Sequence, residues 1–246
     1  RGLSPMGEAV TEETGKREQA KAERRSRIVQ AARDLIRETG DTNLSMRMIA
    51  KRADVSLATP YNLFGSKRAV VLAVFEDERD FAVRFSKIKA ANAIDRLFAA
   101  QALASSYFTD DPDFYQTIWK ALLDTRSPND TGLATPERLE RNSAAWRALI
   151  EAAQAEGLIN ARFASEALER SLSYFANGVM LSWVLGTLET RDLQAAGALG
   201  YAVVLRGAAT GKGVAILDER IATLEALLHH EDAPAPSQKQ AASRGA

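Results

Sequence analysis

The 246-residue sequence contains no cysteine, and its only two histidines are the neighbours His229 and His230. Without cysteine the chain cannot form a disulfide framework, a thiolate metal site or a cysteine nucleophile. Histidine is the side chain that most often performs acid–base catalysis near neutral pH, and none precedes position 229. These absences argue against an enzyme, and we expect neither a cofactor nor a metal ion.

The sequence also lacks net charge, because 32 basic residues balance 32 acidic ones. The balance is uneven along the chain. Residues 16–68 hold 13 Lys or Arg against six Asp or Glu, a surplus of seven positive charges, and the rest of the chain carries the opposite surplus. This segregation predicts a basic N-terminal head that binds a polyanion, attached to an acidic body with another role.

Long uncharged stretches are scarce. One run, 171–188, has 18 residues, which is the lower limit for a membrane-spanning helix. It contains five serine, threonine or asparagine side chains, so we predict instead a helix buried on several sides. The N-terminus has no apolar core of the kind found in secretory signals, and we expect a cytoplasmic location.

Apolar residues recur with the period of a helix, and alternating β-branched runs are absent. This pattern predicts an all-α fold of nine or ten helices. Residues 1–20 are expected to form a flexible arm and residues 231–246 a disordered tail. The predicted helices are 24–39, 46–53, 57–63, a long helix from Lys67 into the eighties, 92–108, 112–124, 135–156, 164–187, 190–206 and 213–229.

Residues 44–67 hold two short helical segments joined by a tight turn through Asp54. Ser45 and Ser56 are candidate N-caps for the two helices. Such a pair is typical of a helix-turn-helix motif, in which the second helix enters the major groove of DNA. Lys67 follows a Gly-Ser turn, where a cation and free backbone N–H groups can bind phosphate. The predicted inward face of the first helix is Met48, Ile49 and Ala53.

From about Ile28 to Phe75 the sequence resembles the tetracycline-repressor (TetR) family of transcriptional regulators. The resemblance rests on many matches at fixed spacing: Ile28-Val29-Gln30-Ala31-Ala32, Gly40, Ser45, Ile49-Ala50, Ala53, Val55-Ser56, Thr59, Tyr61, Phe64 and Ser66-Lys67. It implies a three-helix DNA-binding head over 21–66 and a helical-bundle body over 67–230 that binds a ligand and dimerises. A homodimer of this kind, most often a repressor, binds palindromic operator DNA and releases it when a small molecule enters the body.

On matching positions, the resemblance implies DNA contacts from a defined set of residues in the head. Three arginines just before the first helix would add a basic arm along the DNA. Asp54 replaces a glycine that is usual in the turn, where a positive φ is often needed, and Pro60 replaces an aliphatic residue of the second helix. We therefore expect a distorted start to that helix. The implied DNA contacts are Arg24, Arg25, Arg27, Ser45, Arg47, Ser56, Ala58, Thr59, Tyr61, Asn62 and Lys67.

In the body, uncharged polar residues interrupt apolar helix faces. Their partners could be a ligand, another helix or water. No Lys or Arg lies on the apolar helix faces within 94–108 or 171–188, so a highly charged ligand would lack a counter-ion there. We therefore expect a small hydrophobic or aromatic effector, neutral or singly charged. Its expected place is between helices 92–108, 112–124, 135–156 and 164–187. The candidate ligand contacts are Phe98, Gln101, Ser105, Phe108, Trp119, Trp146, Ser173, Asn177 and Met180.

Two alternatives from other classes stay open. A helical adaptor could use the basic head to bind a protein or an anionic surface instead of DNA. A helical-bundle enzyme would need convergent acids, bases or metal ligands, of which the sequence offers few. Salt-dependent, sequence-selective binding to duplex DNA would separate the regulator from the adaptor.

Overall fold

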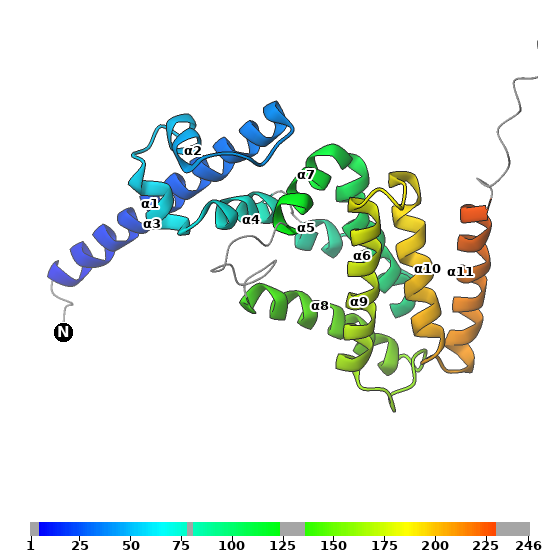
Figure 1. Ribbon diagram of the computed structural model, residues 1–246. Helices are drawn as coiled ribbons and strands as arrows, with labels where there is room; N and C mark the ends of the chain where they lie inside the picture. Colours follow the sequence, from blue (N-terminus) through cyan, green and yellow to red (C-terminus); the bar gives the residue numbers. More distant parts are fainter. Residues whose placement is uncertain (1–4, 78–80, 124–135, 230–246) are drawn as a thin grey trace, which may run out of the picture. The chain divides into compact units, whose positions relative to one another are not determined.

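The computed structural model describes residues 5–77, 81–123 and 136–229, and these residues form eleven α-helices and one short 3₁₀ helix (Figure 1). The described residues contain no strand, only a single bridge between Ile159 and Ala209. The prediction of an all-α fold is therefore confirmed, whereas the predicted tail, 231–246, lies outside the described residues. The chain divides into two compact units, residues 1–83 with 110–139 and residues 84–109 with 140–246.

The first unit contains α1 (Pro5–Thr39), α2 (Met46–Arg52), α3 (Ala58–Phe64), α4 (Lys67–Asp77) and α7 (Pro112–Leu123). Helix α1 packs against α2 and α4, and α4 also packs against α7. The buried face of α1 repeats every three to four residues, as an amphipathic helix requires. Its most deeply buried side chains, with those of the helices around it, are Ile28, Ala32, Ile36, Ile49, Val70, Val74 and Ile118.

Helix α1 begins at Pro5, not near Arg24 as predicted. Residues 5–23 are rich in Glu, Lys, Ala and Arg, which favour a helix by propensity alone. Buried apolar residues with helical spacing begin only at Ile28, so periodicity does not detect the extension. The helix ends at Gly40, as predicted, where φ is +62°.

The predicted long helix from Lys67 into the eighties is described as two helices. Helix α4 ends at Asp77, and α5 (Phe81–Ser86) follows. Residues 78–80 between them lie outside the described residues.

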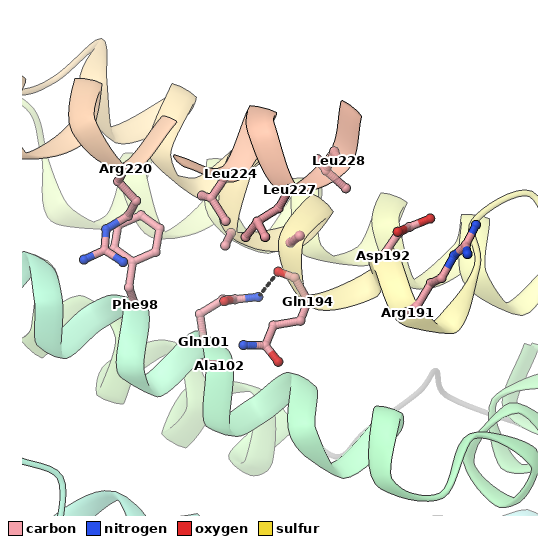
Figure 2. A pocket seen from close by; sticks show the side chains of 12 residues that line it. Phe98, Gln101, Ala102, Arg191, Asp192, Gln194, Arg220, Leu224, Leu227 and Leu228 are labelled. Carbon is pink, nitrogen blue, oxygen red and sulfur yellow. Dashed lines mark hydrogen bonds between the residues drawn. The ribbon is translucent and has the colours of Figure 1, made fainter. Parts of the chain in front are cut away.

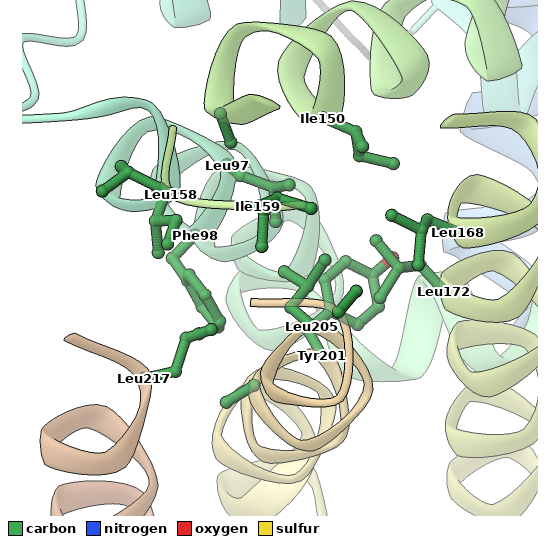
Figure 3. Packing of buried hydrophobic residues seen from close by; sticks show 14 of the residues in the cluster. Leu97, Phe98, Ile150, Leu158, Ile159, Leu168, Leu172, Tyr201, Leu205 and Leu217 are labelled. Atoms are coloured by element: carbon green, nitrogen blue, oxygen red, sulfur yellow. The ribbon is translucent and has the colours of Figure 1, made fainter. Parts of the chain in front are cut away.

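The second unit contains α6 (Ala93–Asp110), α8 (Pro136–Ala155), α9 (Ser165–Val184), a 3₁₀ turn (Thr190–Asp192), α10 (Leu193–Arg206) and α11 (Gly211–His229); the divisions between the units fall within α6 and α8 near their ends. Figure 1 shows α9, α10 and α11 side by side, and α10 packs against both of its neighbours. Figure 3 shows how side chains from these helices meet in one core. The labelled core residues are Leu97, Phe98, Ile150, Leu158, Ile159, Leu168, Leu172, Tyr201, Leu205 and Leu217.

Two glycines allow close approach in this unit. A Cβ on Gly200 of α10 would lie 1.8 Å from the ring of Phe175 on α9. A Cβ on Gly213 of α11 would lie 2.0 Å from the carbonyl oxygen of Leu158. Any larger residue would push these segments apart, so both glycines are needed for the packing of α10 and α11.

Tyr201 is a buried tyrosine of this core, and its ring packs against Trp146 with 5.8 Å between centroids. Burial, with the nearby negative charge of Glu169 as a smaller cause, raises the pKa of Tyr201 to about 12. The hydroxyl is therefore protonated at neutral pH.

The uncharged run 171–188 forms most of α9, but the prediction that it is buried on several sides is wrong for the single chain. Leu172 and Trp183 are buried, whereas Tyr174 is 73% exposed and Leu185 is 67% exposed. The helix therefore has one apolar face in the core and a second apolar face open to solvent. In the described part of the chain, no helix is long and apolar enough to span a membrane.

Candidate nucleic-acid interface

Helix α2 begins at the predicted cap, because Ser45 Oγ accepts a hydrogen bond of 3.1 Å from the N–H of Met48. Ile49 and Ala53 are buried, as predicted, but Met48 is 42% exposed. Met46 is buried instead. The error has a simple reason: Met46, Ile49 and Ala53 share one helical face at spacings of three and four residues, and Met48 does not.

The turn after α2 takes the conformation that a glycine would usually provide. Asp54 has φ of +51° and is the only non-glycine residue with positive φ in the described chain. The N–H of Val55 donates to the carbonyl of Ala50 at 3.0 Å, and the N–H of Asp54 donates to that of Lys51 at 3.4 Å. These two bonds form a Schellman motif, so the aspartate closes the turn in the left-handed conformation.

Helix α3 accommodates Pro60 in its first turn, with the ring buried. A proline N cannot donate to the carbonyl of Ser56, but that carbonyl accepts a hydrogen bond of 3.0 Å from the N–H of Thr59. The start of the helix is thus tightened into a 3₁₀-type turn, a mild form of the expected distortion. The hydroxyls of Ser56 and Thr59 lie 2.8 Å apart and bond to each other.

The predicted contact residues of α2 and α3 lie largely on the solvent side. Tyr61 is 51% exposed, and Arg47, Ala58 and Asn62 are exposed as well, while Thr59 is half-buried. Ser45 and Ser56 are exposed, but their hydroxyls already make the bonds described above. The side opposite this surface packs against α1 and α4.

Helix α4 begins at the residues that were predicted to bind a phosphate. The N–H of Ala69 donates to Ser66 Oγ at 3.1 Å, so Ser66 caps the helix, and the preceding Gly65 has φ of +78°. Lys67, the first residue of the helix, is exposed. An exposed cation at a helix N-terminus can bind a phosphate of the DNA backbone.

The three arginines of the predicted basic arm differ in their surroundings. Arg24 and Arg27 are exposed on α1. Arg25 instead contacts the recognition helix: its Nη1 donates to the carbonyl of Leu63 at 3.3 Å, and its guanidinium lies 4.2 Å above the ring of Phe64. Arg25 therefore links α1 to the C-terminal end of α3.

Sequence reasoning missed one exposed apolar residue of this motif. Met48 was assigned to the core, although it lies outside the spacing of the buried face. Together with Leu57, which is 44% exposed, it offers an apolar surface of the kind that contacts thymine methyl groups.

The nine candidate ligand residues do not gather at one place. Phe98 and Gln101 line a cavity of about 370 Å³ in the second unit, bordered by α6, α10 and α11 (Figure 2). Ser105 accepts a hydrogen bond from Gln101 Nε2, Phe108 contacts Trp183 and Trp146 contacts Tyr201. None of these three lines the cavity, and neither do the remaining four: Trp119 packs on Phe75 in the first unit, Ser173 and Met180 are half-buried on α9, and Asn177 is exposed.

Comparison with known proteins agrees with this geometry. A family model described as bacterial regulatory proteins of the tetR family matches residues 28–74. No curated protein matches the chain.

Several solved structures share the fold. The TetR regulator TylP from Streptomyces fradiae has a TM-score of 0.55 at 18% identity, over 89% of this chain and 96% of that one. SmeT, the repressor of the Stenotrophomonas maltophilia multidrug efflux pump SmeDEF, has a TM-score of 0.55 at 20% identity, over 76% and 91%. Thermus thermophilus FadR, a repressor in complex with lauroyl-CoA, has a TM-score of 0.56 at 20% identity, over 74% and 94%. At these identities the likeness shows the fold alone.

A buried three-helix scaffold that exposes a short helix is typical of the helix-turn-helix class of DNA-binding proteins. The match of the tetR-family model to residues 28–74 shows that this head resembles the DNA-binding part of TetR-family regulators, which supports a DNA-binding transcriptional regulator.

Proposed function

We propose that this chain is a homodimeric repressor that binds a palindromic operator and is released from it by a small hydrophobic effector. The head, residues 21–66 with Lys67, would bind the DNA, and the body, residues 67–230, would hold the effector and the dimer interface. The observation that carries the proposal is the exposed face of α2 and α3, where Arg47, Tyr61 and Asn62 lie outward from a buried scaffold.

The assignment of roles follows from the chemistry of each side chain. Tyr61, Asn62 and Thr59 on α3 would reach base edges or phosphates in the major groove, with Ala58 close to the bases. Ser45, Ser56, Arg47 and Lys67 would contact the phosphate backbone. Arg24 and Arg27 would follow the backbone from the start of the basic segment.

The exposed apolar face of α9 supports a dimer. Leu181 on α9, Leu185 directly after α9 and Val203 on α10 are 44%, 67% and 56% exposed. A second copy of the same face would remove these side chains from water in a two-fold interface. Two heads would then be presented to the two halves of a palindrome.

Release by an effector is supported by the relatives and by the composition of the body. One solved structure of the same fold is a repressor in complex with lauroyl-CoA, and another is the repressor of a multidrug efflux pump. A ligand releases DNA only if it binds more tightly to a body shape that does not match the operator. Helix α4 would transmit that shape, because it begins at Lys67, directly after the head.

Substitutions in the head test the DNA-binding role. Lys67→Ala should weaken binding to every duplex and reduce the slope of log K against log[salt] by about one, because one phosphate contact is lost. Thr59→Val should mainly change which sequences are preferred. Electrophoretic mobility shifts over a salt series, with a library of duplexes, measure both effects.

Lys212→Ala is the matched control, because Lys212 is an exposed lysine near the N-terminus of α11 in the other unit. It should leave the salt slope unchanged. Melting curves check that the head variants fold. If Lys67→Ala and Thr59→Val both leave DNA binding unaltered, the assignment of the head fails, and sequence-independent binding to any anionic surface would favour the adaptor.

A further inference from the structure

The cavity beside Phe98 and Gln101 has a wall of both polar and apolar side chains, and two of its polar groups bear on what it could bind. Figure 2 shows Leu224 and Leu227 of α11 facing Gln101 of α6 across the space. The cavity lies wholly within the second unit and does not coincide with the region between helices 92–108, 112–124, 135–156 and 164–187 where the effector was expected. Its volume of about 370 Å³ falls in the range of small-molecule sites.

The first polar group is the guanidinium of Arg220. It lies 4.3 Å above the ring of Phe98, and its Nη2 donates to Asp95 Oδ1 at 2.6 Å. Its Nε is buried and has no hydrogen-bond partner. Because this atom is shielded from the cavity, Arg220 borders the space chiefly with a cation that is stacked on Phe98 and paired with Asp95.

The second polar group is the amide oxygen of Gln101, a residue only 6% exposed. The amide nitrogen donates to Ser105 Oγ at 3.0 Å and weakly to the carbonyl of Gln194 at 3.4 Å. These two bonds orient the amide, and no described residue donates to Oε1. The oxygen is thus a fixed acceptor at the cavity.

The charges around the cavity decide against an anion. Each arginine in the wall has its own carboxylate: Arg220 pairs with Asp95, and Arg191 pairs with Glu189 at 3.0 Å. Asp192 adds a further negative charge to the wall. An anion would find no surplus of positive charge to offset the loss of its hydration.

We propose that this cavity binds an uncharged amphipathic molecule whose head group donates a hydrogen bond to Gln101 Oε1. Its hydrocarbon tail lies against Leu224, Leu227 and Leu228. The inference deepens the proposed function, on which it rests, because it gives the effector a site and a chemical class.

Calorimetric titration of the full chain without DNA tests the head-group chemistry with three probes of equal tail length. Decanamide both accepts and donates, methyl decanoate only accepts, and decanoate is an anion. We expect decanamide to bind once per chain, methyl decanoate to bind about fivefold more weakly and decanoate at least tenfold more weakly. Equal affinity of the three probes, tighter binding of decanoate or no binding of decanamide at 1 mM would overturn the proposal.

Two variants locate the binding. Leu227→Asp places a charge at the cavity on a side chain that is 58% exposed, so the fold should tolerate it, and decanamide affinity should fall at least tenfold. Ala226→Asp, at an exposed neighbour outside the lining, is the control and should leave the affinity unchanged. In Gln101→Met the preference for decanamide over methyl decanoate should disappear. Unchanged binding in Leu227→Asp would refute the site.

The design separates this inference from the proposed function. Decanamide that binds in the cavity but does not weaken DNA binding would leave the site intact and refute its role as the effector site. A repressor released by other compounds, with no decanamide bound, would leave the proposed function intact and refute the cavity assignment.

Discussion

Arg25 has a different structural role from Arg24 and Arg27, although the three arginines look alike in the sequence. Arg24 and Arg27 are exposed, whereas Arg25 donates to the carbonyl of Leu63 and covers the ring of Phe64. The carbonyls in the last turn of a helix have no partner within it, so a guanidinium at that end also complements the helix dipole. Arg25 thus holds the C-terminal end of α3 against α1.

Replacing Arg25 by alanine should therefore lower stability as well as DNA affinity. Loss of the hydrogen bond and the ring contact should cost about 1 kcal/mol, a decrease in Tm of about 2–4 °C for a chain of this size. Arg24→Ala is the control, with an unchanged Tm and a salt slope reduced by about one. Thermal melting and salt-dependent DNA binding measure the two effects. A normal Tm with a reduced slope in Arg25→Ala would make Arg25 a phosphate contact instead.

Asp54 and Pro60 show how departures from a family pattern can keep its geometry. Asp54 adopts φ of +51° and completes the turn that a glycine usually makes. Pro60 removes one helical hydrogen bond, and the carbonyl of Ser56 accepts from Thr59 instead. Both residues preserve the arrangement of α2 and α3.

At the scale of single elements, α9 has both a buried and an exposed apolar surface. Leu172 and Trp183 anchor it in the core, and Tyr174, Leu181 and Leu185 remain open to solvent. A helix that is apolar all round is stable only where both faces are covered. The exposed face is therefore the surface on which a partner chain would pack.

A charge at Leu185 should produce folded monomers rather than an unfolded chain, because this side chain is 67% exposed in the single chain. Burying an unpaired charge in the interface costs several kcal/mol, so Leu185→Asp should weaken dimerisation at least 100-fold. Light scattering at micromolar concentration should give twice the chain mass for the parent protein and the chain mass for the variant.

Leu227→Asp on α11 is the matched control for the dimer, because Leu227 is similarly exposed but lies on another helix. It should remain dimeric. A parent protein that is monomeric and binds DNA one-to-one would refute the dimer.

At the scale of the whole molecule, zero net charge conceals a basic head and an acidic body. The basic head favours encounter with DNA, and the opposite charge of the body limits non-specific association along its length. The described chain divides into two compact units.

Effector binding and DNA release should be linked across the molecule. In a thermal-shift screen, uncharged amphipathic compounds should raise the Tm and, in proportion to their affinity, weaken DNA binding, because a ligand that prefers the non-binding shape stabilises it. A compound present at 100 times its Kd should add about 2.7 kcal/mol of stability. If only polyanions such as nucleotides stabilise the protein and release DNA, the effector class is wrong.

Much of the head was predictable because its signals are local. The caps at Ser45 and Ser66, the stop at Gly40 and the positive φ of Asp54 depend on residues within about five positions of each other. The buried face of α1 follows from its spacing. Local periodicity also explains two wrong predictions. Met48 was expected on the same buried face as its neighbour Ile49, and the charged start of α1 has no periodic apolar face from which a helix could be predicted.

The sequence by itself determined the helical class, the helix-turn-helix and the likeness of residues 28–75 to TetR regulators, since these depend on period, caps and motif spacing. Only the tertiary structure decided that Arg25 contacts Leu63, that α9 leaves an apolar face uncovered, and that Gln101 and Arg220 border one cavity. The physical reason is sequence distance. Gln101 and Arg220 are more than a hundred residues apart, so no pattern in a single chain reports their proximity, which exists only once α6, α10 and α11 have packed around a common core.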